Sequence, residues 1–144
     1  MPTLLSDPDN GSLTLIIDGD PAPKGSYRAL MIHGKSRLIP MSKREHKWRK
    51  TVAEACKQSH VRIPPHTPVE AQETYYLKRP KTVKRNLPTV PPDIDKLERC
   101  LHDGITDSGL WDDDSRLVKV EAEKVYITGD PKVIITLHWH GMGA

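Results

Sequence analysis

Proline and glycine divide this chain into short segments, and their positions limit the available folds more than any other feature. Thirteen of the 144 residues are proline and nine are glycine. These residues gather at 19–25, at 64–68, in a proline-rich stretch at 79–92 and at 129–131. Since neither residue is favoured inside helices or strands, we expect several short elements. The stretch at 79–92 is a long loop, and such loops in compact domains are usually functional or disordered.

Alternating apolar and polar residues mark the segments that should form strands. This pattern predicts a hairpin over residues 27–39 that turns at 33–35, and single strands at residues 13–18, 69–78, 117–127 and 132–140. In the last strand, the core should receive Val133, Ile135, Leu137 and Trp139. We expect the last two strands to pair as a hairpin through Gly129-Asp130-Pro131.

Two segments have helical periodicity. Ser42, with Glu45 three residues later, is a capping box that should open a helix to about Ser59, with a buried stripe of Trp48, Val52, Ala55, Cys56 and Ser59. A second helix is expected at residues 94–106, closed by Ser108-Gly109, with a core face of Leu97, Cys100, Leu101, Gly104 and Ile105.

The elements follow in the order strand, hairpin, helix, strand, helix, strand, strand. This order predicts a single α/β (α+β) domain at residues 13–144, in which a mixed β-sheet packs with two main helices. Residues 1–12 should form a flexible polar lead-in.

The composition argues against a membrane protein and against a disulfide-stabilised one. No apolar run approaches the length needed to cross a bilayer, and the N-terminus lacks the pattern of a signal peptide. We therefore expect a soluble, intracellular protein that is not secreted. Cys56 and Cys100 fall in predicted helices beside apolar residues, so they should be reduced packing residues.

Negative charge is concentrated in one part of this basic chain. From Asp93 to Asp114 there are eight acidic side chains and two basic ones, while the whole chain has a net charge of +3. Carboxylates this close repel one another unless a cation lies between them, and hard divalent cations prefer oxygen ligands. Asp93 and Asp95 precede and begin a helix, whose N-terminus keeps carboxylates ionised. The pattern favours metal-assisted cleavage of a phosphodiester.

Simpler interpretations of the same residues remain open. Aspartate is common at N-caps and in turns, so Asp93 could be only an N-cap and Asp112-Asp113-Asp114 only a solvated turn. A calcium-binding loop is disfavoured, because the ligand pattern with its central glycine does not fit.

The segment PPDIDKLERCLHDGITDSGLWDDDSRLV resembles the central signature of the RusA-type Holliday-junction resolvases, which are common in phages and prophages. That signature has an Asp-x-Asp at a helix start, a basic residue four positions after the second aspartate, and an Asp-Asp pair after a short turn with glycine and an aromatic residue. The resemblance is dense over residues 91–118. The early Pro-x-Pro-Lys-Gly, the Trp-bearing helix and Arg79-Pro80-Lys81 also agree.

By position, the resemblance implies that Asp93, Asp95 and Asp114 are catalytic metal ligands. They would hold Mg²⁺, with Mn²⁺ as the alternative cation. Asp113 is a weaker candidate ligand than Asp114, and Asp112 has no counterpart in the pattern.

Two residues depart from the pattern. Lys96 stands where asparagine is common, and it could add affinity for phosphate or simply be exposed. Arg99 stands where lysine is usual, and an arginine keeps its proton at working pH. Its implied catalytic role is therefore to support charge on the phosphate or the leaving oxygen. The alternative is an ion pair with Asp95 or Asp103.

Basic residues crowd the segment before the acidic site. We expect DNA phosphates to bind a first cluster together with Lys96, namely Lys78, Arg79, Lys81, Lys84 and Arg85, unless this is only a solvated face. A second cluster comprises Lys35, Arg37, Lys43, Arg44, Lys47, Arg49 and Lys50.

Other candidate sites are weaker. His138 and His140 share one face of the last predicted strand, but a third zinc ligand with suitable spacing is missing. Glu73 is in the inward phase of its strand, and the simplest explanation is that this strand is an edge or that the phase is wrong.

On this resemblance we expect a Mg²⁺-dependent endodeoxyribonuclease that resolves Holliday junctions by paired cuts in DNA recombination and repair. The resemblance implies a homodimer in the cytoplasm of a bacterial host cell, since paired nicks on a two-fold junction suit a two-fold enzyme. The alternatives are a non-catalytic phage DNA-binding accessory protein and a general nuclease for branched DNA. The three aspartates argue against the first, because a binder needs no mutually repelling carboxylates.

Overall fold

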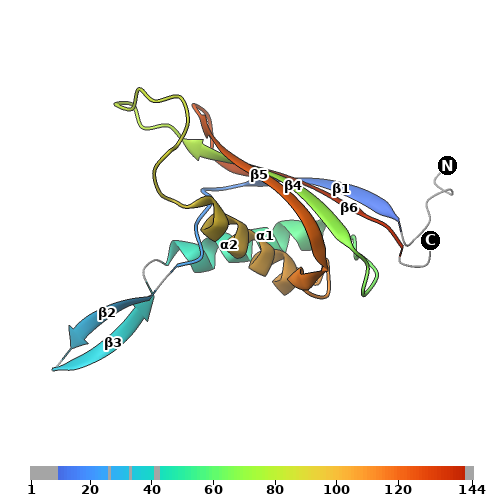
Figure 1. Ribbon diagram of the computed structural model, residues 1–144, viewed down its shortest axis with the longest axis horizontal. Helices are drawn as coiled ribbons and strands as arrows, with labels where there is room; N and C mark the ends of the chain where they lie inside the picture. Colours follow the sequence, from blue (N-terminus) through green and yellow to red (C-terminus); the bar gives the residue numbers. More distant parts are fainter. Residues whose placement is uncertain (1–9, 26, 33, 41–42, 142–144) are drawn as a thin grey trace.

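A four-stranded sheet that carries two helices on one face forms the body of the protein, and a hairpin projects from it (Figure 1). The computed structural model describes residues 10–25, 27–32, 34–40 and 43–141, of which 27–32 and 35–40 by their backbone alone. The elements are β1 (Gly11–Asp18), β2 (Tyr27–Ile32), β3 (Lys35–Pro40), α1 (Arg44–Gln58), β4 (Val69–Lys78), α2 (Ile94–Ser108), the 3₁₀ helix η2 (Asp114–Arg116), β5 (Leu117–Ile127) and β6 (Lys132–Trp139).

The predicted fold class and element order are confirmed. The expected lead-in falls mostly on residues 1–9, which lie outside the described residues, and β1 begins at Gly11 rather than Leu13. His33 of the predicted hairpin turn also lies outside them. Within the part of the chain that is described, no helix is long and apolar enough to span a membrane.

The strand order of the sheet is β1-β6-β4-β5, which corrects one prediction. We expected β5 and β6 to form a hairpin, but β4 lies between them, antiparallel to β6 and parallel to β5. The reason is that the chain leaves β4 and crosses the sheet through α2 before it returns as β5. Parallel neighbours need such a crossover. The connection at residues 128–131 therefore passes the end of β4 instead of making a tight turn.

One face of the sheet is buried against the helices and the other faces solvent. On β6 the predicted inward residues are confirmed, since Val133, Ile135, Leu137 and Trp139 are all buried. On the other face, Ile16 of β1 is 61% exposed. This alternation is what one buried face requires of a sheet.

The start of α1 differs from the predicted capping box. Ser42 lies outside the described residues, Lys43 is the N-cap, and the helix end has no side-chain cap hydrogen bond. The carboxylate of Glu45 instead accepts a hydrogen bond from the backbone N–H of Gly25. The buried stripe contains Trp48, Val52 and Cys56 as predicted, with Ala53 in place of Ala55 and Ser59, which are half-buried.

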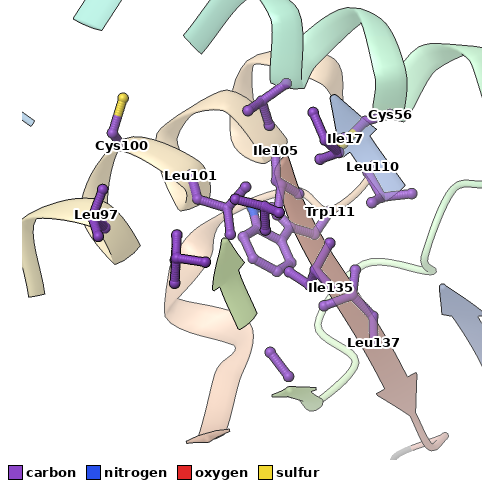
Figure 2. Close-up of a cluster of buried hydrophobic side chains, with 14 of the residues drawn as sticks. Ile17, Cys56, Leu97, Cys100, Leu101, Ile105, Leu110, Trp111, Ile135 and Leu137 are labelled. Atoms are coloured by element: carbon purple, nitrogen blue, oxygen red, sulfur yellow. The ribbon is translucent and has the colours of Figure 1, made fainter. Parts of the chain in front are cut away.

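The two helices meet closely at Gly104, and the core lies between them and the sheet. A Cβ atom at Gly104 would lie 2.8 Å from the side chain of Val52, so only glycine permits this approach. Figure 2 shows Trp111 within the core cluster, near Leu101, Ile105 and Ile135.

Several predictions for the core and for the end of α2 are confirmed. The core face of α2 is buried as expected, and Gly109 ends the helix with φ of 82°. Both cysteines are buried free thiols, and burial raises the pKa of Cys56 to about 11 and that of Cys100 to about 12.

Candidate active site

The N-terminus of α2 presents the first two predicted ligands. Asp93 is the N-cap residue, with extended backbone, and Asp95 lies in the first helical turn. Both residues are exposed. The partial positive charge of a helix N-terminus stabilises carboxylates there. Lys96 lies beside them, with its Nζ 3.8 Å from Asp93 Oδ2, so this end of α2 combines two carboxylates with a cation.

Lys124 holds the segment that leads into this helix. It lies on the inward face of β5, opposite Tyr75 of β4. Its Nζ donates to the carbonyl oxygens of Val90 and Pro92, at 2.8 and 2.9 Å. An ammonium that bridges two carbonyls just before Asp93 restrains where that carboxylate lies. Sequence reasoning missed this residue, although a lysine in the inward phase of a strand was a usable signal.

The aspartate triplet separates into three different environments. Asp112 forms a two-point ion pair with Arg116, at 2.8 and 2.9 Å, which lowers the pKa of Asp112 to about 2. Asp113 is the N-cap of η2 and accepts a hydrogen bond from the backbone N–H of Ser115 at 3.0 Å. Asp114 begins η2 and is exposed, and its carboxylate forms no hydrogen bond or ion pair with any described residue.

The three predicted ligands are not gathered into one site by this chain. Among the described residues, no group of three His, Cys, Asp or Glu side chains is placed to hold a metal ion. Asp93 and Asp95 share one helix end, whereas Asp114 is not grouped with them. Mg²⁺ usually takes only one or two protein carboxylates, together with waters and phosphate oxygens. The donor chemistry of Asp93 and Asp95 therefore fits such a cation.

Arg99 lies one turn along α2 from Asp95 and is exposed. The alternative ion pairs with Asp95 and Asp103 are not formed among the described residues. The Oδ2 atom of Asp103 instead forms ion pairs with Lys24 Nζ at 2.9 Å and with the guanidinium of Arg49 at 3.7 Å. The guanidinium of Arg99 therefore faces solvent on the side of the helix that carries Asp95.

The basic segment before α2 divides into bound and unbound side chains. We call residues 79–92 the proline loop, and Figure 1 shows it projecting beyond the end of β4. Arg79 donates to the carbonyl oxygen of Val83 at 3.1 and 3.0 Å, and Lys78 reaches the carbonyl of Thr128 at 3.4 Å. Lys81 and Lys84 are exposed and form no hydrogen bond or ion pair with described residues.

The second basic cluster is partly engaged in ion pairs. Arg49 binds Asp107 at 2.5 and 2.9 Å, and Arg44 binds Asp20 at 2.8 Å. The side chains of Lys35 and Arg37 lie outside the described residues. His138 and His140 are exposed and belong to no metal-binding group within the described range.

Glu73 lies inside the core rather than at a sheet edge. It is 2% exposed, on a central strand. The Tyr75 hydroxyl donates to its Oε1 at 2.6 Å, and its Oε2 shares a 2.5 Å hydrogen bond with Nε2 of His102 on α2. The expectation that the strand of Glu73 is an edge strand was wrong, but Glu73 does point inward as its place in the alternation predicted. Burial is tolerated because both carboxylate oxygens have partners.

Glu98 lies between this buried carboxylate and the exposed ones. Its pKa is raised, first by burial and then by the charges of Glu73 and Asp95. Glu98 therefore feels both the exposed carboxylate of Asp95 on its own helix and the buried carboxylate of Glu73 on β4.

Comparison with known families decides the family of the chain. The sequence description of the endodeoxyribonuclease RusA family matches residues 19–138. The chain belongs to the RusA endodeoxyribonuclease family. The match covers both helices, η2, β4, β5 and nearly all of β6, and it begins directly after β1, so the predicted family is confirmed. No curated protein matches the sequence significantly. Membership implies an endonuclease of Holliday junctions and hence binding of branched DNA.

Proposed function

We propose that this RusA-family protein resolves four-way DNA junctions in recombination and repair, and that it depends on Mg²⁺, with Mn²⁺ as a substitute. The observation that carries the proposal is the exposed pair Asp93 and Asp95, next to the proline loop with its unbound lysines. Two exposed carboxylates at a helix N-terminus suit a hard cation. The nearby positive charge offsets their repulsion of DNA phosphates.

The catalytic roles divide among a few side chains. Asp93 and Asp95 would hold the cation, and Asp114 joins them in the proposal through its position in the family pattern. When bound, such a cation stabilises charge on the phosphate oxygens and lowers the pKa of water. Arg99 supports the charge on the phosphate or the leaving oxygen, since its guanidinium is free of the carboxylates on its own helix.

DNA phosphates are the proposed partners of the basic side chains. Lys81 and Lys84 extend from the proline loop, and Lys96 lies at the helix end beside Asp93. Lys78, Arg79 and Arg85 form the base of the same surface. Contacts of this kind position the duplex arms without reading their sequence.

We further propose a homodimer that acts in the bacterial cytoplasm. Two symmetric cuts across a two-fold junction require two equivalent active sites, which a two-fold dimer provides.

The decisive experiment incubates the purified protein with labelled four-way junction and with linear duplex of the same sequence, in Mg²⁺ or in chelator. We expect paired cuts in the junction alone, and none in chelator. Tight junction binding without cuts in either cation would indicate the DNA-binding accessory protein. Equal cutting of flaps and junctions would indicate a general nuclease for branched DNA.

A further inference from the structure

A cavity of about 240 Å³ lies under the proline loop. Its walls come from distant parts of the chain, namely the segment after β1, the start of α1, the ends of β4 and β5, and the loop itself. The apolar lining includes Leu77, Pro88, Val90 and Pro92, and the ring of Tyr126 completes it. Lys78 and Arg85 at its rim are proposed above to contact DNA phosphates, but the apolar interior has no role among those assigned above.

Two arginine side chains lie against the Tyr126 ring, which forms the aromatic side of the cavity. The guanidinium carbon atoms of Arg79 and Arg85 lie 5.7 and 5.9 Å from the centroid of the Tyr126 ring. Arg85 also donates from Nε to the Tyr126 hydroxyl at 2.9 Å. Arg85 and Lys78 both line the cavity, so positive charge lies beside an apolar, aromatic interior. A flat apolar group attached to an anion matches this combination.

The cavity adjoins the proposed cutting site. Val90, Pro91 and Pro92 form one wall, and Asp93 is the next residue. Lys124 donates hydrogen bonds to the carbonyl oxygens of Val90 and Pro92. These bonds fix the position of this wall relative to Asp93. A phosphate near Asp93 would therefore have its own nucleoside within reach of the cavity.

We propose that this cavity receives one nucleobase that leaves the stack at the branch point of the DNA. The inference rests on the proposed function. Pockets for drug-sized ligands have volumes of about 300–1,000 Å³, so a smaller cavity suits a single base. Extruding a base is least costly where it is unpaired or already unstacked, as at a branch point. Stacking on an aromatic ring then compensates for the lost base stacking.

The test is photo-crosslinking of the unaltered full chain to DNA with 5-iodouracil at the nucleotides that flank the branch point. Chelator is present so that the DNA stays intact, and the crosslinked peptide is mapped by mass spectrometry. We expect a crosslink to Tyr126 from the four-way junction and none from a linear duplex of the same sequence. Tyr76, on the solvent side of β4, serves as an internal control. Junction bound at normal affinity with crosslinks at other residues alone would overturn the proposal.

A variant that fills the cavity gives a second measure. Val90→Trp adds an indole from an exposed wall residue, and Leu87→Trp adds the same group on the same loop outside the cavity. We expect Val90→Trp to lose roughly five- to hundredfold in junction affinity, the range for loss of one base–aromatic stack, and to keep its affinity for linear duplex. Leu87→Trp should bind both DNAs as the unaltered chain does.

The outcomes separate the two proposals. If the unaltered chain cuts junctions while Val90→Trp binds them normally, the base-binding role is wrong and the nuclease function stands. If the unaltered chain neither binds nor cuts junctions, both are wrong.

Discussion

The protein places carboxylates in two opposite environments around α2, one in the core beneath the helix and one at its exposed N-terminus. In the core, Glu73 has a hydrogen bond to each carboxylate oxygen, from Tyr75 and with His102 of α2. At the exposed end of α2, Asp95 forms no hydrogen bond or ion pair with a described residue, and Asp93 has only a long contact of 3.8 Å to Lys96. The core carboxylate is committed to stability. The exposed ones keep their oxygens available for a cation.

The same contrast divides the aspartate triplet. The ion pair with Arg116 occupies Asp112, and the cap of η2 occupies Asp113, whereas Asp114 remains unbound within the described structure. A carboxylate that already has a strong partner must lose it before it can bind a metal ion. The lack of such a partner therefore supports Asp114, rather than Asp112 or Asp113, as the metal ligand. The position of Asp114 in the family pattern agrees with this.

The largest expected effect comes from breaking the buried network. Glu73→Ala leaves the His102 ring and the Tyr75 hydroxyl buried with no partner, so the free energy of unfolding should fall by roughly 2–5 kcal/mol. Urea denaturation followed by circular dichroism measures this. The matched control is Glu73→Ile combined with His102→Phe and Tyr75→Phe, which removes all three polar groups and should restore most of the loss. A loss below about 1 kcal/mol for the single variant would contradict a structural role.

Asp95→Asn should instead remove cutting and spare the fold. Loss of a cation ligand should lower the junction cleavage rate in Mg²⁺ about a hundredfold or more, while junction binding survives or tightens because one charge that repels phosphate is gone. Asp112→Asn is the control, since it removes the same charge from a carboxylate that already pairs with Arg116. Near-normal cutting by Asp95→Asn would contradict the proposal that Asp95 binds the catalytic cation.

Arg99 tests whether an exposed cation on the same helix face acts in catalysis. Arg99→Met should slow cutting about a hundredfold, the usual result of losing one preorganised electrostatic group. Arg99→Lys should keep much of the rate, because it supplies the same charge from the same position. Unfolding should change little in both variants, since no ion pair is lost. A Met variant that unfolds earlier and cuts normally when folded would make Arg99 structural.

Exposed lysines of the proline loop should affect binding more than cutting. Replacing Lys81 and Lys84 with Ala should weaken the binding of all DNA structures. It should also flatten the salt dependence of affinity by about 0.9 per lost phosphate contact. Arg85 is left in place, because it binds Tyr126. The combined Lys57→Ala and Lys119→Ala variant is the charge-matched control. An unchanged slope would place the duplex elsewhere.

Substitution of Glu98 should have the smallest effect on stability, because this side chain lies between the buried Glu73 and the exposed Asp95. Its folded pKa is raised above 4.5, mainly by burial. A raised carboxyl pKa reduces the stability of the folded state as pH rises through the unfolded value toward the folded one. Glu98→Gln should therefore raise the melting temperature near pH 7 and leave it unchanged below the unfolded pKa. A rise of equal size at both pH values would mean that the charge of Glu98 is not the cause.

The sequence alone determined the local elements well. The bounds of β4 and β5 match the predicted residues 69–78 and 117–127, because alternation is strong and turn residues flank both strands. The acidic signature likewise identified the helix N-terminus and the family. Both follow from neighbours within a few residues, which is the range over which a pattern can be read.

Tertiary structure alone decided the strand neighbours and the partners of the carboxylates. Alternation states which face a residue occupies and not which strand lies beside it, so β4 between β5 and β6 was not predicted. Glu73 and His102 are 29 residues apart, and Lys124 lies more than 30 residues from the carbonyls that it binds. Such contacts form only when α2 crosses the sheet. This crossover, and not the charge pattern, separates the carboxylates that hold the fold together from those left free to act.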